Sequence, residues 1–363
     1  MLLNYTLSLA WPPSVVSSKG FGDLFYQLQK CTSVKRALLL TALVLVLCQL
    51  EAKTLYVKQG SNGDGSSWIK AFGNLQAALE VAIAGDTILV AAGHYLPTEN
   101  GDRNKSFIVK DGVVLLGGFY GNENSIESRN PELNPTVLSG EIGDLSSIAD
   151  NSYTVIYTKN VSKATVVDGF VITKGAAKGS TSTEPIKMGG AGWFNEAENG
   201  TSSPSIKNCV FIDNVALEGA GLYNRANQGG ICKPLVKDCK FIRNISNVDG
   251  GAILNVGMDG SADPIVVNCQ FEANEATYGA GIMNKIDGIG QAAPMVKNCS
   301  FIKNIAYSRG SGVYNYRTPS AKGTSEATMT GCRFEGNDST IGGEINSRVN
   351  NGNDNSTINN SGY

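Results

Sequence analysis

Histidine and net charge are both nearly absent from this chain. Among its 363 residues the only histidine is His94, and the formal net charge is −2. A Ser-His-Asp or Cys-His mechanism needs an imidazole base beside its nucleophile. We interpret His94, in the sequence Ala-Gly-His-Tyr, as a residue at a corner of the fold. So small a charge gives no electrostatic reason to expect nucleic acid as a partner.

Closely spaced cysteines and long apolar runs are also lacking. Five cysteines lie thirty residues or more apart and no histidine joins them, so the spacing of a zinc site is not met. They are Cys209, Cys239, Cys269, Cys299 and Cys332. The most apolar run, residues 37–47, is too short to span a membrane comfortably.

What the sequence does contain is one pattern that recurs five times between residues 204 and 346. In each copy a phenylalanine follows the cysteine by two residues, an asparagine follows three residues later, and a glycine-containing segment ends in a second asparagine. The first asparagines are Asn214, Asn244, Asn274, Asn304 and Asn337, and the second are Asn224, Asn255, Asn284, Asn315 and Asn346. The cysteines step by thirty residues and finally by thirty-three. A fixed period indicates a repeat architecture.

A period of thirty with frequent glycine and asparagine favours one coil of a parallel β-helix per repeat. Helical repeats need amphipathic stretches of about ten residues, which glycine and asparagine interrupt here, and propeller blades are longer. Leucine is too scarce for a leucine-rich repeat. Ile265, Val267 and Phe271 alternate with polar residues, which predicts a strand over 265–272 with one apolar face.

Stacked coils place equivalent residues in columns along the axis. We expect the cysteine and phenylalanine columns to point inward, with the cysteines reduced because parallel side chains disfavour disulfide geometry. Asparagine at the turns tolerates left-handed backbone, and stacked amides can bond to one another. Segment length varies most after the second asparagine, which predicts recognition loops on that side. These loops are 225–233, 256–263, 285–293 and 317–327.

The repeat also carries a family resemblance. Phe241-Ile-Arg-Asn244 followed by Gly250-Gly-Ala-Ile253 resembles the paired motif of the chlamydial polymorphic outer-membrane proteins. Residues 54–346 as a whole resemble secreted right-handed parallel β-helix proteins of the Bacteroidetes type. The resemblance implies an all-β, right-handed parallel β-helix at the cell surface or outside the cell. It implies no reaction, because the motif residues are structural.

The first hundred residues predict a leader, a signal and a capping unit. We interpret residues 1–33 as a non-mature leader and 34–52 as a secretory signal peptide, with an internal anchor helix as the alternative. Residues 53–100 predict a strand at 54–57, a turn-rich loop at 60–67, a helix at 74–83 and a strand at 87–92. The helix is expected to cover the open end of the first coil, because an uncovered coil exposes unpaired strand edges.

Residues 101–346 predict the β-helix coils, with two segments leaving them. These are a polar arm at 121–135 and an insertion at 179–184. Residues 347–363 are rich in asparagine, glycine and serine without an apolar period, which predicts a disordered, truncated tail.

No catalytic constellation is evident in the sequence. The charged residues of the repeats are scattered, and we interpret them as a solvated outer face; they are Asp213, Glu218, Asp238, Asp249, Glu272, Glu275, Arg243, Lys303 and Arg309. Asn62 and Asp64 fit a plain turn better than a calcium loop, which needs more carboxylates. We therefore expect no catalytic residue, no metal and no cofactor.

The function that fits these patterns is a secreted or cell-surface display scaffold. Its side loops would bind glycans or neighbouring proteins, with no membrane span in the mature chain. The alternative is a polysaccharide lyase or glycoside hydrolase of the same fold. Two or more carboxylates converging in one groove with an arginine or lysine would favour the enzyme.

Overall fold

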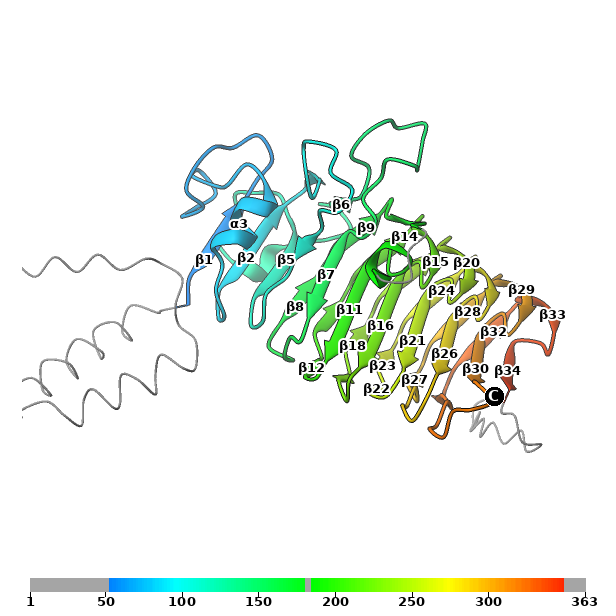
Figure 1. Ribbon diagram of the computed structural model, residues 1–363. Coiled ribbons are helices and arrows are strands. Elements are labelled where there is room, and N and C mark those ends of the chain that lie inside the picture. Colours follow the sequence, from blue (N-terminus) through cyan, green and yellow to red (C-terminus); the bar gives the residue numbers. More distant parts are fainter. Residues whose placement is uncertain (1–51, 180–183, 349–363) are drawn as a thin grey trace, which may run out of the picture. The chain divides into compact units, whose positions relative to one another are not determined.

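The chain folds as a parallel β-helix, in which short strands follow one another around a coil and each coil lies on the previous one (Figure 1). The computed structural model describes residues 52–179 and 184–348. Parallel pairing joins equivalent positions of neighbouring coils, as with Phe211, Phe241 and Phe271. The all-β parallel β-helix predicted from the period is confirmed.

Two long sheets, named A and B here, form adjoining sides of the coils. Sheet A contains β1 (Thr54–Val57), β2 (Thr87–Ala91), β5 (Val114–Phe119), β8 (Val166–Asp168), β13 (Ser205–Lys207), β18 (Leu235–Lys237), β23 (Ile265–Val267), β27 (Met295–Lys297) and β31 (Thr328–Thr330). Sheet B contains β3 (Gly93–Tyr95), β6 (Thr136–Ser139), β9 (Phe170–Thr173), β14 (Val210–Ile212), β19 (Lys240–Ile242), β24 (Gln270–Glu272), β28 (Ser300–Ile302) and β32 (Arg333–Glu335).

Three further sheets, named C, D and E, complete the coils. In a coil that contains all five sheets, the chain passes through them in the order A, B, D, C, E. Sheet C contains β4 (Phe107–Ile108), β7 (Ile156–Lys159), β11 (Trp193–Glu198), β16 (Leu222–Asn227), β21 (Ile253–Gly257), β26 (Ile282–Ile286), β30 (Val313–Arg317) and β34 (Ile345–Arg348). Sheet D contains β10 (Ala176–Ala177), β15 (Val215–Glu218), β20 (Ile245–Asp249), β25 (Glu275–Tyr278), β29 (Ile305–Arg309) and β33 (Asp338–Ile341). Sheet E contains β12 (Thr201–Ser202), β17 (Ile231–Cys232) and β22 (Ser261–Ala262).

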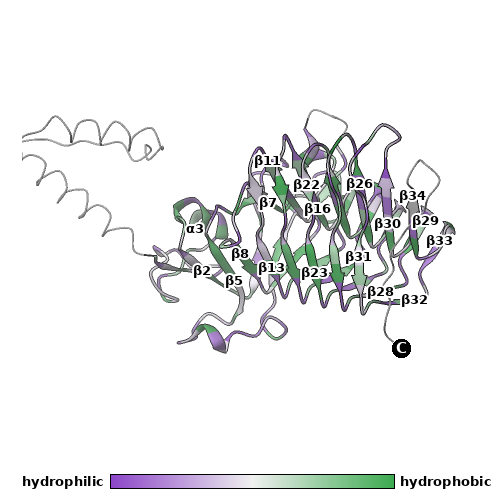
Figure 2. Cartoon of the chain, turned by 90° about the horizontal axis from the view of Figure 1, so that it is seen from below, coloured by the Kyte–Doolittle hydropathy of each residue, from purple (hydrophilic) through white to green (hydrophobic). Residues whose placement is uncertain are grey.

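The interior is built from the predicted columns. The rings of the phenylalanine column are stacked nearly parallel, with 4.6 Å between the centroids of Phe211 and Phe241 and 5.1 Å between those of Phe241 and Phe271. The repeat cysteines are buried and free, as expected. Each donates to backbone carbonyls, as Cys239 does to Ile206 O at 3.6 Å. Apolar residues follow the stacked strands in Figure 2, and the corners are mostly hydrophilic.

The two asparagine columns bond along the axis as predicted. Nδ2 of Asn244 donates to Oδ1 of Asn274 at 3.0 Å, and Asn274 repeats this bond to Asn304 at 2.9 Å. In the second column Asn224 donates to Asn255 at 2.9 Å and Asn255 to Asn284 at 2.8 Å. These side chains are fully buried, so the ladder satisfies amides that would otherwise be costly to desolvate.

The left-handed backbone position was predicted wrongly. Positive φ occurs one residue before the first-column asparagine, as at Arg243 (φ 50°) and Ala273 (φ 52°), and again one residue before the cysteine, as at Asn268 (φ 55°). The ladder asparagine therefore supplies hydrogen bonds, and its neighbour makes the turn. A corner at Asn268 also divides the single strand predicted over 265–272 into β23 and β24. Val266 consequently faces the core, and Ile265 is 40% exposed.

The last coil departs from the predicted register. Strand pairing places Asn346 beside Tyr314 and Ser347 beside Asn315. Asn346 therefore lies in the outward tyrosine position, and Ser347 takes the place predicted for the asparagine. The predicted copy has one residue fewer between its two asparagines than the shortest of the other copies, which shifts the strand register by one residue. Strand β34 also continues two residues past the predicted boundary at 346.

The capping unit resembles its prediction closely. Helix α3 (Leu75–Val81) begins after Asn74, whose Oδ1 accepts from Ala77 N at 2.8 Å. Leu75, Ala78 and Leu79 are buried in the same core as strands β1 and β2. The helix ends two residues before the predicted 83, at an extended Ala82. No helix among residues 52–179 and 184–348 is long and apolar enough to cross a membrane.

Several predicted segments outside the regular strands have a different structure. Two of the predicted recognition loops contain strands of sheet E, β17 in 225–233 and β22 in 256–263, and Gln291 of a third loop forms an isolated bridge with Ser261. The arm 121–135 contains a 3-10 turn, η1 (Ile126–Ser128), and folds back onto the coils, where Arg129 Nη2 donates to Asp168 Oδ1 at 2.7 Å. The predicted leader, most of the signal segment, residues 180–183 and residues 349–363 lie outside the described residues.

Candidate functional site

Buried aromatic residues and partly buried ion pairs lie together at the junction of sheets D and C. Each coil turns there through a glycine, such as Gly279 (φ 64°) or Gly310 (φ 66°). A Cβ atom on either glycine would lie 2.7 Å from the Cβ of Met283 or of Tyr314. Only glycine permits the end of a sheet D strand to approach the outer face of sheet C so closely.

Three rows of outward-facing residues run along the coils at this junction, and we name them the outer strip. Row 1 ends the sheet D strands: Glu218, Asp249, Tyr278 and Arg309. Row 2 lies on sheet C: Tyr157, Phe194, Tyr223, Leu254, Met283 and Tyr314. Row 3 lies two residues further along sheet C: Lys159, Glu196, Arg225, Val256, Lys285 and Tyr316.

Row 2 faces away from the coil interior, yet its side chains are largely buried. Leu254 is 0% exposed, Met283 1% and Tyr314 2%. They form an apolar cluster outside the main core, against which Tyr278 and Tyr316 pack while half-buried. The strip therefore has an apolar floor between two more polar rows.

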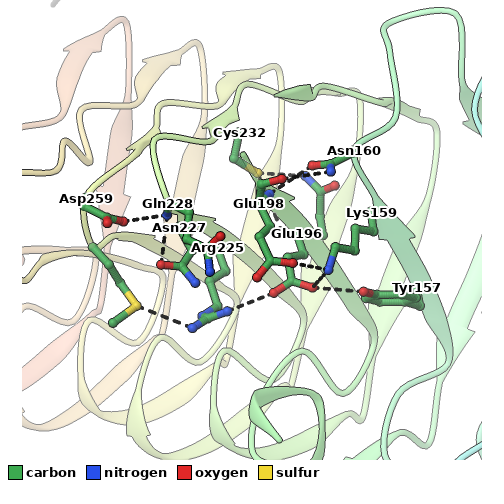
Figure 3. A network of polar contacts seen from close by, with 12 residues as sticks. Tyr157, Lys159, Asn160, Glu196, Glu198, Arg225, Asn227, Gln228, Cys232 and Asp259 are labelled. Atoms are coloured by element: carbon green, nitrogen blue, oxygen red, sulfur yellow. Dashed lines mark hydrogen bonds and ion pairs between the residues drawn. The ribbon is translucent and has the colours of Figure 1, made fainter. Parts of the chain in front are cut away.

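The first half of the strip is a closed network of charges (Figure 3). Arg225 Nη1 donates to Glu196 Oε1 at 2.8 Å, and Tyr157 Oη donates to Glu196 Oε2 at 2.9 Å. Lys159 pairs with both Glu196 and Glu198. Burial, reinforced by Glu196, raises the pKa of Tyr157 far above its ordinary value, which keeps the hydroxyl a donor. All these charges are matched within the network, so this half has a structural role.

The second half of the strip contains a pocket of about 220 Å³. It is lined by Val248, Asp249, Tyr278, Met283, Lys285, Tyr314 and Tyr316. The ring centroids of Tyr278 and Tyr314 are 5.7 Å apart, and those of Tyr314 and Tyr316 are 6.2 Å apart. We name this pocket of about 220 Å³ the tyrosine pocket. A larger pocket of about 290 Å³ beside Asp213 and Arg243 has no aromatic lining.

Lys285 connects two carboxylates at the edge of the tyrosine pocket. Its Nζ lies 2.7 Å from Asp249 Oδ2 and 3.7 Å from Glu218 Oε1. Burial raises the pKa of Glu218; Lys285 opposes this shift and Asp249 adds to it. Burial alone would lower the pKa of Lys285, but the two carboxylates outweigh it and raise that pKa. The environment of Glu218 therefore favours its protonated form.

The predicted solvated outer face is therefore correct for some charges and wrong for two. Asp213 and Arg243 form an exposed pair at 2.9 Å, and the carboxylate of Glu275 binds the hydroxyl of Tyr307 at the surface. Glu218 and Asp249, by contrast, are brought together on neighbouring strands, with Asp249 only 4% exposed.

Sequence reasoning missed Lys285 and the three tyrosines of the pocket. The available signal was positional: Tyr278, like Glu218 and Asp249, directly precedes a corner glycine. Lys285 and Tyr316 each follow a second-column asparagine. Lys285 begins the predicted loop 285–293 and Tyr316 directly precedes the predicted loop 317–327, and both residues lie in strands of sheet C.

His94 and Asp64, which the sequence analysis interpreted as structural rather than functional residues, lie away from the outer strip. His94 is an exposed residue of β3 rather than a corner residue, and its backbone N–H donates to Gln59 Oε1 at 3.2 Å. Asp64 accepts from Ser66 N at 3.0 Å in a local turn. Within the described ranges, no group of three or more His, Cys, Asp or Glu side chains is suited to hold a metal ion.

Comparison with known proteins gives little further information. No protein-family model matches the chain, and the search of curated proteins finds no match. The chain is similar to a solved structure described as a rhamnogalacturonan lyase, with 12% identity over 74% of this chain and 84% of that chain and a TM-score of 0.32. A similarity of this size assigns no family and no activity, so function must be inferred from the site itself.

Proposed function

We propose that this chain is a secreted or cell-surface scaffold that binds a glycan in the tyrosine pocket. The observation that carries the proposal is the combination of Tyr278, Tyr314 and Tyr316 with the Asp249–Lys285 pair in one pocket. Sugar rings present C–H faces to aromatic rings and hydroxyls to charged groups. Apolar walls with a few fixed polar groups are what ligand pockets provide. The signal-like segment at 34–52 supports a location outside the cytoplasm.

Binding is expected to depend on the half-buried ring of Tyr316. In Tyr316→Ala the affinity for a glycan identified on an array should fall about tenfold, or about 1.4 kcal/mol, because the ring would contribute stacking area. Titration calorimetry on the full chain measures this change. Tyr307→Ala is the matched control, since Tyr307 is 60% exposed and does not line the pocket. If both variants bound the glycan as tightly as the parent, the pocket would have no role in binding. Glycan binding would likewise be contradicted if the chain bound a protein partner and no glycan.

Polysaccharide cleavage is a second candidate, favoured by one specific observation. Glu218 and Asp249 converge on Lys285, and burial raises the pKa of Glu218. Glu218 would then donate a proton, and Asp249, which pairs with Lys285, would be the second carboxyl group of the site. Because only protonated Glu218 can donate, activity should fall as pH rises through its raised pKa.

A reducing-sugar release assay over a panel of polysaccharides tests this second candidate. Cleavage should be lost in Asp249→Asn and retained in Asp213→Asn, whose carboxylate is paired at an exposed corner. Absence of release by the parent chain at both acid and neutral pH would reject the enzyme and leave the binding scaffold.

A further inference from the structure

Arg309 is the cation of the outer strip that has no carboxylate partner. It ends strand β29 in row 1, directly beside Tyr278 in the strand register. Its backbone carbonyl accepts from Gly279 N at 3.0 Å, which fixes the position of the residue. Among the described residues no ion pair includes Arg309.

The other three cations of the strip are neutralised within the protein. Lys159 and Arg225 contact Glu196, and Lys285 contacts Asp249 and Glu218. Arg309 differs from them although it is half-buried. A guanidinium cannot shed its charge at any ordinary pH, so a partly desolvated one favours an anion from outside.

The position of Arg309 relates it to the tyrosine pocket. Row 1 brings Tyr278 between Asp249 and Arg309, so the Cα atoms of Asp249 and Arg309 are separated by two strand spacings, about 10 Å. Tyr314 and Tyr316 lie on the next strand of the same coil as Arg309. An anionic group bound at Arg309 would therefore be near the tyrosine strands, and the charge of Asp249 on the far side of Tyr278 is already balanced by Lys285.

From this arrangement we infer that the glycan is acidic, with an anionic substituent bound by Arg309 while a ring lies on the tyrosines. The inference rests on the proposed glycan-binding function and names the ligand class. A carboxylate matches the two parallel N–H groups of a guanidinium, as does a sulfate ester. The shared chemistry is a planar or tetrahedral oxyanion on a sugar.

The test compares three oligomers by calorimetry on the full chain: a hexuronate oligomer, its uncharged methyl ester, and a neutral-sugar oligomer that carries sulfate esters. The hexuronate or the sulfated oligomer should bind at least tenfold more tightly than the methyl ester. The oligomer that binds more tightly identifies the oxyanion as carboxylate or sulfate. Arg309→Gln should abolish this preference, Arg309→Lys should retain part of it, and Arg243→Gln should leave it unchanged, because Arg243 already pairs with Asp213.

The outcomes separate this inference from the function on which it rests. Equal binding of the ester and the acidic oligomers would overturn the acidic ligand and leave glycan binding intact. Binding of no oligomer in this panel or on an array would overturn both. A preference that survives in Arg309→Gln, with an unchanged melting temperature, would overturn the assignment to Arg309.

Discussion

Phe271→Ala is expected to lower the free energy of unfolding by about 3–5 kcal/mol, the usual cost of deleting a fully buried ring. The side chain of Phe271 is 0% exposed and stacks on both neighbours, with centroids 5.1 Å from Phe241 and 4.6 Å from Phe301. Strand pairing on either side fixes these neighbours, so they cannot move in to fill the cavity. Urea denaturation of the full chain, followed by circular dichroism, measures the effect.

The control for Phe271 is an aromatic residue outside the stack. Tyr307→Ala removes a ring that is 60% exposed and should change the free energy of unfolding by no more than about 0.5 kcal/mol. A loss below about 1 kcal/mol in Phe271→Ala would show that the column does not hold the coils together.

Asn274→Ala should lower the free energy of unfolding by about 3 kcal/mol, although it removes only three heavy atoms of the side chain. Its Nδ2 donates to Phe241 O and to Asn304 Oδ1, and its Oδ1 accepts from the backbone and the side chain of Asn244. The substitution leaves each of these buried partners short of a bond, and each unsatisfied group costs about 1–3 kcal/mol.

An exposed asparagine of the same coil region provides the comparison. Asn247 lies on the outer face of β20, and Asn247→Ala should change stability by less than about 0.5 kcal/mol. Thermal unfolding of both variants against the parent distinguishes them. Similar losses in the two variants would mean that the buried ladder contributes nothing beyond an ordinary surface asparagine.

The interior of the fold was predictable because the same residue type returns at every coil. Phe271 and Asn274 recur at fixed spacing, so their burial and their mutual bonds follow from stacking alone. The corners were harder to predict. The left-handed residue before Asn274 is alanine, while other coils have aspartate, arginine, lysine or glycine there. Hydrogen bonds to the neighbouring coil fix the backbone of this residue, as between Ala273 N and Ile302 O at 2.9 Å. The type of its side chain therefore does not predict the left-handed turn.

The candidate site was less predictable because it is made of residues that differ from coil to coil. From one coil to the next, the residue in row 1 is glutamate, aspartate, tyrosine and then arginine. A position whose residue type differs in every coil gives no repeat pattern from which its neighbours could be predicted. Asp249 and Lys285 are 36 residues apart in the sequence and meet only because β20 ends beside the outer face of β26. Their proximity depends on a glycine corner whose direction no local pattern specifies.

The asparagine columns also give the β-helix an electrical direction. In both columns the Nδ2 of one asparagine donates to the Oδ1 of the asparagine in the following coil, from Asn214 to Asn337 and from Asn195 to Asn315. In the first column the other N–H of the amide donates to a backbone carbonyl of the preceding coil, so the shared direction is that of the Oδ1 atoms, which face the preceding coil. Amide dipoles aligned head to tail add up, as they do along an α-helix, and here their positive end is at the later coils. The negative charge of an elongated anionic ligand on the outer strip would therefore be favoured toward the Arg309 end.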